Sequence, residues 1–98
     1  MTDAELRMLL LDCLQLWAVP GRVVVGDDSV TILAKDGAFT IQRADPDLRP
    51  VRWFLQTPER SVAGRSPRAL PSVVALLSAL RNALGGEGGR ALRVGGTG

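Results

Sequence analysis

The first segment of the chain places apolar residues three and four positions apart, which is the spacing of one helical face. These positions are Leu6, Leu9, Leu10, Cys13, Leu16 and Trp17. Thr2 followed three residues later by Glu5 is the pattern of a capping box, which begins a helix. Pro20-Gly21 turns the chain. The pattern predicts a helix that begins after Thr2 and ends before Pro20.

Short β-branched runs separated by turn residues follow this helix. They cover residues 22–25, 30–35, 38–43 and 51–57. Asp36-Gly37, which lies between two apolar runs, is the strongest hairpin signal in the chain. Because the connections between the first three runs are short, consecutive strands are antiparallel neighbours. The pattern therefore predicts a four-stranded antiparallel meander.

Helical spacing returns near the end of the chain. Residues 71–84 carry apolar side chains at Val73, Leu76, Leu77, Leu80 and Leu84, and Gly85-Gly86 follows as a helix end. Residues 59–69 are polar and arginine-rich and predict a loop. Residues 87–98 are glycine-rich, so we expect a disordered tail that is dispensable for folding. Residues 1–86 are then one domain.

The order helix, four strands, helix defines the predicted fold, an α+β two-layer sandwich of the type α-β-β-β-β-α. Each helix has one apolar stripe, and the simplest arrangement packs both helices on one face of the sheet. Side chains alternate between the two faces of a strand. The positions that we expect to face the helices are Val23, Val25, Ile32, Phe39, Ile41, Val51, Trp53 and Leu55.

Composition removes most familiar catalytic chemistries. The chain of 98 residues is 46% apolar and 22% charged, as in ordinary globular proteins, but it has no histidine and one cysteine. Histidine acid–base catalysis, Ser-His-Asp triads and cysteine-ligated zinc sites are therefore excluded. Phosphate-binding loop motifs are also missing. A carboxylate-only enzyme is the catalytic alternative that remains. We expect instead a non-enzymatic protein without catalytic residues, cofactor or metal.

Smaller candidate sites have plain structural interpretations. Cys13 lies on the apolar stripe of the first helix, where we expect a small buried hydrophobe rather than a reactive thiol. Asp27-Asp28 and the pair Asp45 and Asp47 are interpreted as turn residues, because calcium needs more oxygen ligands. The acidic amino terminus and the broken apolar run 9–11 predict no signal or membrane segment, so the expected location is the cytoplasm.

Charge is distributed unevenly along the chain, although the net charge is only +2. Residues 1–47 hold eight acidic and four basic residues, whereas residues 48–98 hold two acidic and eight basic residues. Such asymmetry can mark an anionic partner. The alternative, that the two halves neutralise each other in the fold, is favoured, because nucleic-acid-binding domains usually carry a larger net positive charge.

The sheet face that the helices leave uncovered is the candidate binding surface. By alternation this face carries Val24, Leu33 and Phe54, and Arg52 and Gln56 supply a polar rim. Apolar patches with polar rims often mark partner surfaces. We expect a protein partner there, most simply a second copy in a homodimer. The alternatives are that the sheet curls or that residues 59–69 fold across this face.

A nucleic-acid-binding module is the second functional hypothesis. Arg49, Arg52, Trp53 and Phe54 form a basic and aromatic cluster in the sequence. Adjacent strand residues point to opposite faces, so only Phe54 can be outward, where it could stack on a base beside Arg52. The first hypothesis remains a non-enzymatic protein-interaction module, either an adaptor or chaperone-like, that self-associates through the open sheet face.

Overall fold

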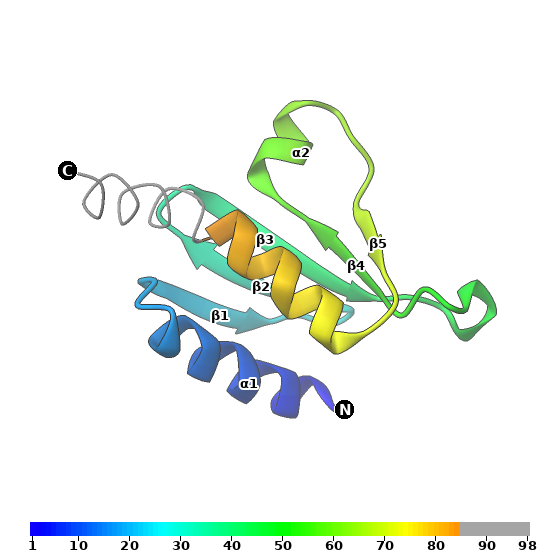
Figure 1. Ribbon diagram of the computed structural model, residues 1–98, viewed down its shortest axis with the longest axis horizontal. Coiled ribbons are helices and arrows are strands. Elements are labelled where there is room, and N and C mark those ends of the chain that lie inside the picture. Colours follow the sequence, from blue (N-terminus) through cyan, green and yellow to red (C-terminus); the bar gives the residue numbers. More distant parts are fainter. Residues whose placement is uncertain (85–98) are drawn as a thin grey trace.

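The structure is a computed structural model that describes residues 1–84, and it shows an α+β fold with a five-stranded antiparallel sheet (Figure 1). The strands follow chain order across the sheet, so the predicted meander is confirmed with one strand more than expected. The expected tail, residues 87–98, lies outside the described residues. The elements are α1 (Asp3–Leu16), β1 (Gly21–Val25), β2 (Ser29–Ala34), β3 (Gly37–Arg43), the 3-10 turn η1 (Pro46–Leu48), β4 (Trp53–Gln56), α2 (Pro58–Val62), β5 (Arg68–Leu70) and a helix over residues 73–84.

Both long helices begin at a side-chain cap. At α1 the Thr2 hydroxyl accepts the Glu5 backbone N–H at 3.1 Å, and the Glu5 carboxylate accepts the Thr2 N–H at 3.0 Å. This reciprocal pair is the capping box that the sequence predicts. The helix over 73–84 starts after Ser72, whose hydroxyl accepts the Ala75 N–H at 3.1 Å. Pro71 therefore precedes this helix instead of beginning it.

The hairpins fix the register of the first three strands. Ala34 pairs with Gly37, so the β2–β3 loop consists of Lys35 and Asp36. Gly37 begins β3 with a φ of +133°, a conformation that side chains with a Cβ rarely adopt. A Cβ at this position would also lie 2.9 Å from Pro58 Cγ. The hairpin prediction is confirmed, with glycine placed at the first position of the strand.

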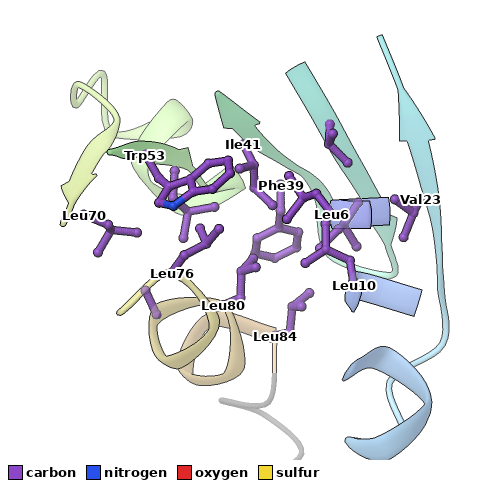
Figure 2. Packing of buried hydrophobic residues seen from close by; sticks show 14 of the residues in the cluster. Leu6, Leu10, Val23, Phe39, Ile41, Trp53, Leu70, Leu76, Leu80 and Leu84 are labelled. Carbon is purple, nitrogen blue, oxygen red and sulfur yellow. The ribbon is translucent and has the colours of Figure 1, made fainter. Parts of the chain in front are cut away.

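One hydrophobic core lies between the sheet and the two long helices (Figures 1 and 2). Figure 2 shows Phe39, Ile41 and Trp53 pointing from the strands toward Leu76 and Leu80 of the helix over 73–84. From α1 the core receives Leu6, Leu10 and Leu14, whereas Leu16 of the predicted apolar face is 81% exposed. Because these three lie on one helical stripe, α1 packs on the same face as the second long helix. The other face of the sheet has no long helix packed on it among residues 1–84.

The predicted inward positions are buried or half-buried except at the β1 edge. Six of the eight are buried in the core, and Val51, just before β4, is half-buried. Val25, in contrast, is 42% exposed, because it lies at the end of an edge strand that has a neighbour on one side only. Val30 is buried as well, in register with Val25 and Ile41, although the prediction did not include it.

The connection after β4 differs from the predicted loop. Thr57 caps α2, a single short helix, by accepting the Arg60 N–H at 3.2 Å. The chain then returns to form β5, which pairs antiparallel with β4. This strand has three residues between Pro67 and Pro71, too few for the alternation of a strand to be visible in the sequence. The predicted loop over 59–69 is therefore corrected to a helix, a short loop and the start of β5.

Candidate interaction surface

The register arranges the outward side chains of the sheet in three rows. In one row Arg22 lies beside Leu33 and Ala38, and in the next Val24 lies beside Thr31, Thr40 and Gln56. In the third row Ser29 lies beside Gln42, Phe54 and Ala69. The predicted apolar residues therefore share one face, but threonine and glutamine residues separate Phe54 from Val24 and Leu33.

The β1 side of this face carries its exposed apolar surface. Val24 and Leu33 are 43% and 42% exposed and lie on adjacent strands, one row apart. Arg22 lies directly across from Leu33, and the row that they share contains no acidic residue. We call Arg22, Val24 and Leu33 the β1-side patch. These residues come together because β1 and β2 are joined by a two-residue turn, Asp27-Asp28.

The β4 side of the face is partly covered. Phe54 and Gln56 are half-buried, and Gln56 Nε2 donates to the Arg65 carbonyl at 3.1 Å. Arg60 Nε donates to the Ser66 carbonyl at 2.9 Å, which holds the α2–β5 segment together. Gln56 thus ties this segment to the sheet instead of forming a free polar rim. The segment crosses only the β4 side and leaves the β1-side patch open.

Arg52 and Phe54 line two different hollows of the surface. Phe54 and Gln42 line an open hollow whose other walls are largely carboxylates, from Asp3, Asp27, Asp28 and Asp45. Arg52 lines a second hollow with Met1, Trp53 and Val73. Arg43 borders both hollows. The fold therefore does not join Arg52 and Phe54 into one basic and aromatic surface.

Arg43 lies at the point where the amino terminus meets the sheet. Its guanidinium is 5.4 Å from the centre of the Trp53 ring, which is within range of a cation–π interaction. It also pairs with the Asp3 carboxylate at 3.2 Å and donates to the Met1 carbonyl. Sequence reasoning missed this role, although Arg43 follows Phe39 and Ile41 at alternate positions and so faces the helices.

The titratable groups of the described residues form no reactive cluster. Burial raises the pKa of the Cys13 thiol, and Asp12 adds to the effect, so this half-buried cysteine is mainly protonated near neutral pH. No ionisable or polar residue in the described chain is fully buried. Within residues 1–84, no three Cys, Asp or Glu side chains are grouped to hold a metal ion.

Comparisons with protein-family models, with curated proteins and with solved structures each gave no match. In the part of the chain that the structure describes, every helix is too short or too polar to cross a membrane. The class defined by these observations is a helix-backed antiparallel sheet with one open face.

Proposed function

We propose that this protein is a non-enzymatic protein-interaction module, adaptor or chaperone-like, that self-associates through the β1 side of its open sheet face. The observation that carries the proposal is the β1-side patch, where Val24 and Leu33 are exposed on the sheet face opposite the two long helices. Apolar surface of this kind is stabilised by contact with a partner. A reducing compartment such as the cytoplasm is part of the proposal, because Cys13 has no second cysteine to pair with.

A second copy is the simplest partner for this patch. A two-fold contact uses the same surface on both copies, so each exposed apolar residue is buried twice in one complex. Burial contributes about 25 cal/mol per Å² of apolar surface, which must offset the entropy lost on association. Because the patch is small on one copy, we expect association in the micromolar range instead of a permanent assembly.

The test replaces one patch residue with a charge. A contact that buries the β1-side patch would also bury the Val24→Asp carboxylate without a partner, so the substitution should abolish such a dimer while the core stays intact. Val62→Asp is the matched control, because Val62 is 90% exposed on α2, away from the patch. Sedimentation velocity should show a monomer for Val24→Asp and a dimer for Val62→Asp. Equal association of both variants would contradict the proposed surface.

The nucleic-acid hypothesis receives less support from the geometry. A base stacked on Phe54 would place its phosphates near the carboxylates of Asp27, Asp28 and Asp45. Like charges repel there, whereas nucleic-acid surfaces gain most of their affinity from cations beside the phosphates. We expect no binding of single-stranded oligonucleotides at physiological salt. Binding that weakens steeply with salt and disappears in Arg52→Ala would favour the hypothesis again.

A further inference from the structure

Strand β1 is an unusual edge for a small sheet. It has a strand neighbour on one side only, and three of its five residues are the consecutive valines Val23 to Val25. Exposed edges are usually protected by proline, lysine or very short length. The opposite edge, β5, has such protection, with three residues between two prolines. Pro20 precedes β1, but the strand itself is longer and contains neither proline nor lysine, and its one charged residue is Arg22.

The hydrogen bonds of the β1–β2 hairpin determine which backbone groups point to the free edge. The Gly26 N–H donates to the Ser29 carbonyl at 2.7 Å, which marks these two residues as a hydrogen-bonded pair. In an antiparallel ladder, bonded and non-bonded pairs alternate. Val24 and Arg22 therefore bond to Thr31 and Leu33 of β2. Gly21, Val23 and Val25 direct their N–H and C=O groups away from β2.

These free groups are self-complementary in one register. If a second copy of β1 lies antiparallel and centred on Val23, then Val23 faces Val23 and Gly21 faces Val25 of the other copy. All three free positions then fall in hydrogen-bonded pairs, each of which exchanges two bonds. Arg22 and Val24, which already bond to β2, fall in the non-bonded pairs between them. No free N–H or C=O of β1 is left without a partner.

The side chains fit the same register. Val25 is 42% exposed on the helix side of the sheet, and in this register it lies across from Gly21, which has no side chain to collide with it. On the outer face Arg22 lies across from Val24 of the second copy. Asp27 and Asp28 of that copy begin about 10 Å farther along its chain, a distance that an arginine and an aspartate side chain can span together. The two β1-side patches become one continuous surface.

We propose that two copies of the chain pair through their β1 edges, antiparallel and centred on Val23, to form one continuous sheet. The pairing rests on the self-association proposed above and places its contact at the backbone edge of β1, beside the β1-side patch. Within the pair, the combined outer face presents Val24 and Leu33 of both copies side by side.

Proline at a free-edge position tests the pairing selectively. Val25→Pro removes an N–H that points away from β2, so the hairpin keeps its own bonds while the dimer loses two. Val25→Thr is the matched control, because it keeps the N–H and the branched shape. By sedimentation velocity we expect a folded monomer for Val25→Pro and a dimer for Val25→Thr, with wild-type far-UV circular dichroism for both.

Cysteine cross-linking tests the register independently of any effect of proline on folding. In a Cys13→Ala background, Arg22→Cys and Val24→Cys are made as separate proteins. Residues 22 and 24 of different copies form a non-bonded pair with Cα atoms about 4.5 Å apart, within the range of a disulfide. Oxidation of the mixture should give the disulfide-linked heterodimer far faster than it gives either homodimer.

The outcomes separate this inference from the proposal beneath it. A wild type that stays monomeric overturns both the self-association and the edge pairing. A wild-type dimer that persists in Val25→Pro, with no preferential cross-link in the mixture, overturns the edge pairing alone. If Val24→Asp still abolishes the dimer in that case, the β1-side patch remains the contact between the two copies. Monomeric Val25→Pro together with the heterodimeric disulfide supports the pairing.

Discussion

Single residues hold the amino terminus of the protein to its sheet. Arg43 connects three groups, because it stacks over Trp53, pairs with Asp3 and donates to the Met1 carbonyl. An exposed cation–π interaction contributes about 0.5–1 kcal/mol, and an exposed ion pair contributes about as much or less. Arg43 also covers one end of the core, where Trp53 is buried. Its side chain therefore acts through packing as well as through charge.

We predict that Arg43→Ala lowers the free energy of unfolding by about 1–2 kcal/mol, because the stacking and the ion pair are both lost. Asp3→Asn is the matched comparison, since it removes the ion pair and leaves the arginine over Trp53. It should cost less than Arg43→Ala in chemical denaturation monitored by tryptophan fluorescence. Equal losses in the two variants would mean that the stacking contributes nothing.

The cap of α1 gives the protein one defined response to acid. The Thr2 backbone N–H, and to a smaller extent its hydroxyl, lowers the pKa of Glu5 below its ordinary value of 4.5. A carboxyl whose pKa is depressed by folding stabilises the fold above its unfolded pKa and loses that contribution as the pH falls through the folded pKa. Glu5→Gln keeps an acceptor at the cap but does not titrate.

We therefore predict that wild type is more stable than Glu5→Gln at neutral pH and that the difference shrinks below pH 4.5. Urea denaturation at a series of pH values measures the difference directly. A gap that stays constant from neutral pH to below the folded pKa would show that the Glu5 carboxylate has no stabilising contact in the fold.

At the scale of elements, the β2–β3 hairpin depends on a glycine for two separate reasons. Gly37 has a positive φ, and a Cβ there would meet Pro58, the first residue of α2. Gly64 also has a positive φ, +69°, but no atom lies within 4 Å of the place where its Cβ would be. A comparison of alanine substitutions at these two positions therefore separates the energetic cost of backbone strain from the cost of steric collision.

Gly37→Ala should destabilise the fold more than Gly64→Ala does. Strain alone costs about 1–3 kcal/mol, and at Gly37 the displacement of α2 adds to it. Thermal unfolding of both variants provides the measurement. If Gly64→Ala proved the more harmful change, the contact between the hairpin and α2 would have no energetic weight.

The helix over residues 73–84 offers a second matched pair. Leu76 is completely buried and Val74 is 73% exposed, although they are two positions apart. Leu76→Ala should lower stability by about 2–5 kcal/mol, because it leaves a cavity in the core. Val74→Ala should change stability by less than about 0.5 kcal/mol. Comparable effects in denaturant unfolding would contradict the placement of this helix.

Elements with long periodic patterns could be predicted from the sequence, and short ones could not. The helix of residues 3–16 has a capping box and a full apolar stripe, so both its type and its start are visible. The strand Arg68–Leu70 is defined only by its pairing with β4, which is a long-range contact that no local pattern records. The Thr57 cap likewise could not be recognised from the sequence, because the helix that it begins, α2, has only five residues.

The candidate site shows the same division. Alternation correctly placed Val24, Leu33 and Phe54 on the outer face, because it depends only on the period of a strand. Their separation by Thr31, Thr40 and Gln42 depends on the register between strands, which the hairpins determine. The tie between Gln56 and Arg65 requires the return of the chain after α2. The sequence alone therefore could not show that the five predicted residues do not form one contiguous patch.

The whole molecule has one protected side and one open side. The core unites both long helices with the inner sheet face, and β5 closes one edge with a short, proline-flanked strand. The β1 side of the outer face has no long helix over it among the described residues, and β1 has a strand neighbour on one side only. Because both open features involve β1, one contact with a second copy satisfies the free backbone groups and brings the exposed apolar side chains of both copies onto one face.

Sedimentation velocity of the wild-type protein across the micromolar range tests self-association, the central claim, most directly. The account predicts a sedimentation coefficient that rises with concentration from that of the monomer toward that of a dimer. The dimer should persist when the salt concentration is raised, because apolar contacts and backbone hydrogen bonds are screened little by ions. A single monomeric species at every concentration in this range would contradict the account.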